Sequence, residues 1–78
     1  MATEPDPTGL DDTERAILDL EARTFRHMGS KERAIREELG MRRGTYFVRL
    51  NALLDKPAAL QYAPMLVNRL RARRTSAA

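Results

Sequence analysis

The feature that most constrains this chain is a glycine between two apolar helical patterns, within residues 34–50. Ile35 and Leu39 share one face of a helix, and Gly40 follows where a left-handed turn favours glycine. Met41 is an apolar residue just after that turn, and a second helix is predicted from about residue 42. Two helices joined by a glycine turn form a helix-turn-helix, the unit that places its second helix in the major groove of DNA.

Helical periodicity also accounts for most of the remaining chain, and no stretch alternates with period two. Asp11 or Asp12 is predicted to cap the first helix, and Asp11 has capping-box spacing from Glu14. Gly29 is predicted to end the first helix, Ser30 to cap the second, and Pro64 to begin the last. We expect helices over about residues 12–28, 31–39, 42–54 and 64–73, with one helical turn over 57–60. The predicted fold class is all-α, a compact three- to four-helix domain containing a helix-turn-helix.

The length of 78 residues predicts one domain. Residues 10–74 form this single helical domain, with the helix-turn-helix at about 31–54, between a disordered lead over 1–9 and a flexible tail over 75–78. No apolar run is long enough for a membrane span or a signal peptide, which predicts a cytoplasmic protein without a membrane partner. A homodimer stays open, because the domain is small and has no disulfides.

Composition argues against catalysis and against a cofactor. The chain has no cysteine and one histidine, so the sequence offers no convincing transition-metal site. His27 lies near a predicted helix end, where a surface or capping role is common. There is no glycine-rich phosphate loop, and a chain of this length with 42% hydrophobic residues leaves no room for an enzyme-sized pocket in its core. We predict no enzymatic activity and no cofactor.

Charge is unevenly distributed along the chain. Residues 1–30 hold three arginines and seven acids, a balance of −4, whereas residues 31–78 hold eleven lysines and arginines and four acids, a balance of +7. The two balances sum to the formal net charge of +3. Positive charge therefore accompanies the predicted helix-turn-helix, as the binding of a phosphate backbone requires.

An advance of 100° per residue divides the helix over residues 42–54 into two faces. The predicted inward stripe holds the large apolar residues Tyr46, Phe47, Leu50, Leu53 and Leu54. The opposite face holds small or polar residues and one valine: Gly44, Thr45, Val48, Asn51 and Ala52, with Arg49 at its edge. Small residues on this face let a duplex approach closely, so we expect it to face DNA.

Side-chain chemistry assigns expected contacts within the basic half. Arginine reads guanine, asparagine reads adenine, and threonine contacts thymine methyl groups. Backbone N–H groups at a helix start attract phosphate, so we also expect contacts from the two arginines at the start of this helix. A basic C-terminal arm is expected to follow the phosphate backbone or to enter a minor groove. The predicted DNA-binding set is Arg42, Arg43, Thr45, Arg49, Asn51, Lys31, Arg71, Arg73 and Arg74.

A second interpretation stays open for the same surfaces. An exposed Val48, the acidic first helix and the last helix would also suit a protein-interaction module that docks on the transcription machinery or another regulator. Arginines in the last turn of a helix stabilise its dipole whether or not a ligand binds. The leading prediction is nonetheless a double-stranded DNA-binding protein, a transcriptional regulator or nucleoid-associated protein located at the nucleoid.

Two resemblances accompany these patterns. Residues 35–54 resemble a generic bacterial helix-turn-helix. The pattern is an apolar residue, three other residues, Leu39-Gly40 and another apolar residue, followed by a Thr and an aromatic–x–x–Leu. Arg36 stands where that pattern usually has Ala. Residues 10–73 are similar to a family of small actinobacterial proteins known as a domain of unknown function. The segments that carry this similarity include Glu14-Arg15-Ala16-Ile17-Leu18-Asp19, Gly29-Ser30-Lys31-Glu32, Leu50-Asn51-Ala52-Leu53-Leu54, Pro57-Ala58-Ala59-Leu60 and Pro64-Met65-Leu66-Val67. Members usually have a Trp-rich pair in the first helix, where this chain has Thr24-Phe25. The resemblance implies a compact helical fold.

Overall fold

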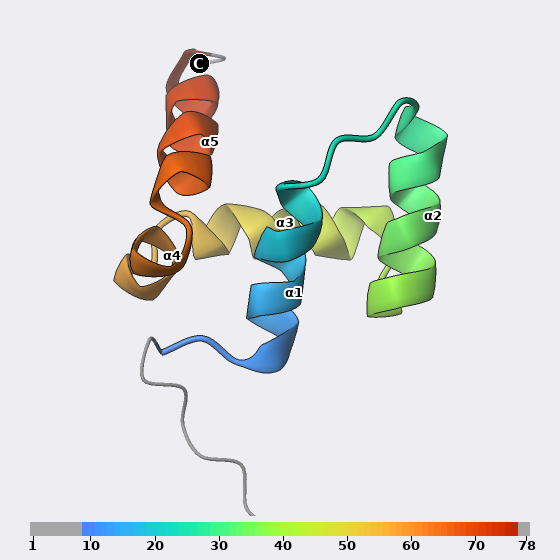
Figure 1. Cartoon of the computed structure of the whole chain (residues 1–78), viewed down its shortest axis with the longest axis horizontal. Helices are drawn as coiled ribbons and strands as arrows, with labels where there is room; N and C mark the ends of the chain where they lie inside the picture. Colours follow the sequence, from blue (N-terminus) through green and yellow to red (C-terminus); the bar gives the residue numbers. More distant parts are fainter. Residues whose placement is uncertain (1–8, 77–78) are drawn as a thin grey trace, which may run out of the picture.

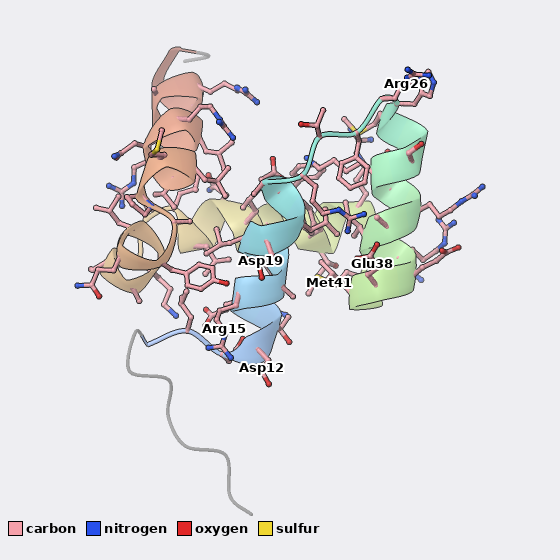
Figure 2. The ribbon with its side chains drawn as sticks, viewed as in Figure 1. Asp12, Arg15, Asp19, Arg26, Glu38 and Met41 are labelled. Carbon is pink, nitrogen blue, oxygen red and sulfur yellow. The ribbon has the colours of Figure 1, made fainter. Side chains whose placement is uncertain are left out.

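The first helix, α1 (Asp12–Glu21), begins at a capping box. The Asp11 carboxylate accepts a hydrogen bond from the Glu14 backbone N–H at 2.7 Å, and the Glu14 carboxylate accepts one from the Asp11 backbone N–H at 2.9 Å. These bonds satisfy two backbone donors that a helix start leaves free. Arg15 also pairs with Asp12 one turn away, and both lie at this end of the molecule (Figure 2).

The computed structural model describes residues 9–76, the side chains through residue 74. The other helices are α2 (Met28–Leu39), α3 (Arg43–Leu53), α4 (Pro57–Tyr62) and α5 (Pro64–Ser76). Helix α3 runs crosswise behind α1, with α2 at one end and the α4–α5 pair at the other (Figure 1). Helices α1, α2 and α3 all contact one another, and α5 packs mainly on α4. No strand occurs among the described residues, so the predicted all-α class is confirmed.

One apolar core joins the five helices. Its buried members are Leu10, Ile17, Leu18, Leu20, Ala34, Ile35, Tyr46, Leu50, Leu53, Leu54, Ala59, Leu66 and Val67. On α3 the predicted inward stripe is confirmed, since all five of its residues are buried or half-buried. The core contains no buried charged side chain among the described residues, and its one phenol, Tyr46, has a hydrogen-bond partner.

Gly40 joins α2 to α3 through the predicted left-handed conformation, with φ of 65°. Its N–H donates to the carbonyl of Arg36, and the N–H of Met41 donates to the carbonyl of Ile35. These bonds satisfy carbonyls that the helix end would leave free. Arg36 itself is exposed, whereas Ala34 and Ile35 are buried, so the arginine does not occupy the interface between the two helices.

The boundaries of the first two helices differ from those predicted. Helix α1 ends at Glu21 instead of about residue 28, and residues 22–27 form a connection in which Phe25 is half-buried beneath the Arg23 guanidinium. Gly29 does not end a helix and Ser30 does not cap one, because both lie in the first turn of α2, whose N-cap is His27. The first turn tolerates glycine and serine, since its backbone N–H groups have no partner within the helix.

The C-terminal half has more helix than predicted. The single turn expected over residues 57–60 is the six-residue helix α4, which gives five helices instead of three to four. Proline occupies the first position of both α4 and α5, where its missing N–H costs no hydrogen bond. Helix α5 continues to Ser76, into the segment predicted to be a flexible tail. Of the predicted lead and tail, residues 1–8 and 77–78 lie outside the described residues.

Candidate nucleic-acid interface

The side of α3 that faces away from the core is exposed along its length. Gly44, Thr45, Val48, Arg49 and Ala52 are all exposed, as the helical periodicity predicts. Val48, in the middle of the helix, is 71% exposed. This face therefore combines open space, small residues and one apolar contact point.

Arg42 and Arg49 supply positive charge to that face. Arg42 is the N-cap of α3 and Arg49 lies two turns along, so the seven-residue spacing places them on one stripe with Thr45 between them. Both arginines are exposed, and neither side chain has a hydrogen bond or an ion pair within the described part of the chain. Two guanidinium groups are thus available to an external anion.

Arg43 is held more closely. Its Nε lies 3.3 Å from Glu32 Oε2 on α2, and its guanidinium lies 6.0 Å from the centre of the Phe47 ring. The side chain is nevertheless 63% exposed, and a surface ion pair of this kind contributes about 0–1 kcal/mol to stability. An external phosphate therefore competes with Glu32 for this arginine at little energetic cost.

Three of the predicted contacts lie instead at the junction of α3 with α5. The Arg74 guanidinium donates to Asn51 Oδ1 at 2.9 Å and to Asp55 Oδ1 at 3.0 Å. Arg71 Nε donates to the carbonyl of Leu54. Asn51, Arg71 and Arg74 thus hold α5 on the C-terminal end of α3. Of the predicted contacts Arg71, Arg73 and Arg74, only Arg73 is exposed and without such a bond in the described region.

Lys31 belongs to a partly buried network rather than to the exposed face. Its Nζ lies 2.8 Å from Glu21 Oε1, and the two side chains are only 15% and 9% exposed. The Tyr46 hydroxyl donates to the same carboxylate at 2.6 Å. Burial first, and then this hydrogen bond, raise the pKa of Tyr46 well above its usual value near 10. Lys31 is therefore committed to the junction of α1, α2 and α3.

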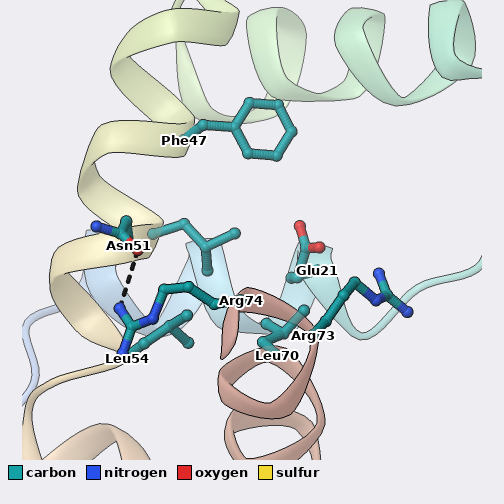
Figure 3. A pocket seen from close by; sticks show the side chains of 8 residues that line it. Glu21, Phe47, Asn51, Leu54, Leu70, Arg73 and Arg74 are labelled. Carbon is teal, nitrogen blue, oxygen red and sulfur yellow. Dashed lines mark hydrogen bonds between the residues drawn. The ribbon is translucent and has the colours of Figure 1, made fainter. Parts of the chain in front are cut away.

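A groove lies between α3 and α5, beside the end of α1 (Figure 3). Its volume is about 350 Å³ and its lining is mostly apolar. We call it the α3–α5 groove, and the residues that line it are Glu21, Phe47, Leu50, Asn51, Leu54, Leu70, Arg73 and Arg74. Periodicity predicts Phe47, Leu50 and Leu54 on the inward face, but it does not predict where α5 docks, so it did not predict a groove beside them.

Residues 9–76 contain no metal-binding cluster and no membrane-spanning helix. No group of three or more histidine, cysteine, aspartate or glutamate side chains is arranged to hold a metal ion among these residues. No helix in the described part of the chain has the length and apolar character needed to cross a bilayer. The acidic residues of α1, such as Asp12 and Asp19, lie apart along its exposed side (Figure 2).

Comparison with known proteins identifies one family. A model of a protein family described as a protein of unknown function (DUF3263) matches residues 9–78, which is most of the chain. Neither a search of curated proteins nor a search of solved structures gave a significant match.

Proposed function

The chain belongs to the DUF3263 family of proteins of unknown function, and from its geometry we propose that it binds double-stranded DNA as a transcriptional regulator or nucleoid-associated protein. In this proposal α2, the Gly40 turn and α3 act as a helix-turn-helix, with α3 in the major groove. The geometry that supports it is a three-helix unit whose last helix leaves one face uncovered.

The observation that carries the proposal is the stripe of Arg42, Thr45 and Arg49 on that uncovered face. Both arginines are exposed and have no partner in the described structure, whereas Arg15, Arg23, Arg43 and Arg74 each have one. A guanidinium that no internal acid neutralises is suited to a phosphate or to the O6 and N7 atoms of guanine.

The rest of the α3 face fits a duplex in shape. Gly44 and Ala52 have small side chains, which allows close approach of the sugar-phosphate backbone. Thr45 and Val48 present methyl groups of the kind that contact thymine. On α2, Arg33 and Arg36 are also exposed, but the exposed acids Glu37 and Glu38 follow them, so the charge of this helix is mixed. The base-reading role predicted for Asn51 is not included, since its amide oxygen is bonded to Arg74.

The test is the salt dependence of duplex binding. Log affinity falls with log salt concentration by about 0.9 for each phosphate neutralised, so Arg42→Ala and Arg49→Ala should each reduce the slope by about 0.9 if both arginines contact phosphate. A loss of base selectivity with an unchanged slope would instead assign Arg49 to a guanine. Arg26→Ala is the matched control, because Arg26 is exposed and lies at the α1–α2 connection (Figure 2).

Two results would overturn the proposal. One is the absence of detectable duplex binding by the folded protein at about 50 mM salt, where phosphate contacts are strong. The other is an equal effect of all three alanine variants, which would show that only net charge matters. Light scattering of the same samples measures whether the protein binds as a homodimer.

A protein-interaction module is the second candidate. The observation that favours it is the exposure of Val48 at 71% and of Met65 at 84%, on α3 and α5 respectively. Exposed apolar side chains mark a protein contact surface where they form one contiguous patch with a polar rim. This candidate predicts that Val48→Asp abolishes partner binding while the duplex titration shows no binding at any salt concentration.

A further inference from the structure

The α3–α5 groove has an apolar floor that the proposed DNA contacts do not use. Phe47, Leu50 and Leu54 of α3 and Leu70 of α5 form this floor (Figure 3). The groove volume of about 350 Å³ lies at the small end of the range of roughly 300–1,000 Å³ found for small-molecule sites. Such a floor gains free energy when a hydrocarbon chain displaces water from it.

The rim of the groove is positively charged. Arg73 is exposed and forms no ion pair with the residues described. Glu21, the only acid among the lining residues, is already neutralised by Lys31 at 2.8 Å and bonded by the Tyr46 hydroxyl at 2.6 Å. The charge left without a partner is therefore that of an arginine, which favours an anionic group.

The shape of the groove selects a compact ligand over a long one. The Arg74 side chain reaches from α5 to Asn51 on α3, and both residues line the groove (Figure 3). A second bond from Arg74 to Asp55 fixes the same guanidinium. An amphipathic helix lying along the groove would displace the Arg74 side chain from both partners, whereas a single hydrocarbon chain need not.

We propose that the α3–α5 groove binds a small anionic amphiphile, specifically an unbranched fatty carboxylate. Its chain lies on the floor formed by Leu50, Leu54 and Leu70, and its carboxylate lies at Arg73. This site is separate from the exposed stripe of Arg42 and Arg49, so it is tested without DNA.

The first experiment uses the unmodified protein. Hexanoate, octanoate, decanoate and the neutral analogue decanol are titrated while the methyl resonances of Leu50, Leu54 and Leu70 are followed by NMR. Each added methylene should strengthen binding by up to roughly fourfold, as burial of one such group predicts. Decanoate should bind more tightly than decanol, since only decanoate gains the contact with Arg73.

Four outcomes of this titration would overturn the proposal. These are decanol binding as tightly as decanoate, affinity independent of chain length, shifts that centre on Met28 or Met65 instead of the groove, and no carboxylate binding tighter than about 1 mM. An amphipathic acidic peptide that binds the same leucines while every carboxylate fails would assign the groove to a protein partner, which also contradicts the proposal.

Variants then test the role of the arginine. Arg73→Glu should weaken decanoate binding by roughly fivefold, the effect of losing a partly exposed ion pair, and leave decanol binding unchanged. Arg26→Glu makes the same charge change away from the groove and should alter neither. An equal loss in both variants would refute a contact with Arg73. If either variant unfolds, the comparison of decanoate with decanol on the unmodified protein still decides the question.

Discussion

Replacing Tyr46 with phenylalanine tests the network that joins the first three helices. The Tyr46 side chain is fully buried, and its hydroxyl donates to the Glu21 carboxylate at 2.6 Å. A hydrogen bond to a charged group contributes roughly 1.5–3 kcal/mol, and removing the donor leaves the carboxylate with one partner fewer. Because Lys31 remains at 2.8 Å, Glu21 is not left unpaired, so we expect a loss of about 2 kcal/mol.

That loss is a large part of the total free energy of unfolding. A chain of this length has roughly 4–12 kcal/mol in all, and a loss of about 2 kcal/mol lowers Tm by roughly 8–16 °C. Urea unfolding followed by circular dichroism measures the free energy, and thermal unfolding measures Tm. Tyr62→Phe is the matched control, because the Tyr62 hydroxyl bonds to Asp19 at the surface and its removal should scarcely change stability.

The same variant predicts a pH dependence. The pKa of Tyr46 is raised in the folded protein, so the unfolded chain loses this proton first as pH rises. The stability that Tyr46 contributes is therefore fully present below about pH 10 and is lost progressively above it. The difference between the unmodified protein and Tyr46→Phe should be constant up to about pH 10 and then shrink. A difference below about 0.5 kcal/mol at neutral pH, or an equal loss in Tyr62→Phe, would refute this reasoning.

Two further predictions concern the turn and the first helix. Gly40→Ala should destabilise the fold by about 1 kcal/mol, because φ is 65° there. Gly44→Ala should stabilise it by roughly 0.5–1 kcal/mol, because Gly44 has a helical backbone and open space for a methyl group. Urea unfolding should therefore give changes of opposite sign in the free energy of unfolding, and changes of the same sign would contradict the prediction. The Lys56 hydrogen bond holds the pKa of Glu14 below its usual value, so the stability it contributes is present above about pH 4.5 and is lost as pH falls. Between about pH 5 and pH 3, the free energy of unfolding of Glu14→Gln should therefore fall less than that of the unmodified protein. An equal fall in both proteins would contradict the stabilising role of the Glu14 carboxylate.

Periodicity and turn chemistry predicted the centre of this fold. The two faces of α3 follow from the spacing of Tyr46, Leu50 and Leu53, and the turn before it follows from Gly40, because each depends only on neighbouring residues. The predicted end of α1 was wrong because it also depended on spacing alone. Phe25 has helical spacing from Ile17 and Leu18, but it reaches the core from a connection instead of from a longer helix.

The partners of the charged residues were beyond prediction from sequence. Glu21 meets Lys31 and Tyr46, and Arg74 meets Asn51, only because the tertiary fold brings these segments together. Twelve arginines in one chain give no local sign of which will be paired. The exposed stripe of α3 was predictable because it depends on helical spacing, and the α3–α5 groove was not, because it depends on where α5 docks.

Helix α5 is less buried against the rest of the protein toward its C-terminal end. Its first turns bury Leu66 and Val67, Leu70 is half-buried, and Ala72, Arg73 and Arg74 are exposed. Local opening from the C-terminal end therefore exposes little apolar surface and requires much less free energy than global unfolding. Amide hydrogen exchange should be fastest around Arg74 and slow steadily toward Val67, with the slowest amides in α1 and α3. The contact between Arg74 and Asn51 therefore belongs to the least firmly held part of the α3–α5 junction, and the contacts of Leu66 and Val67 to the most firmly held.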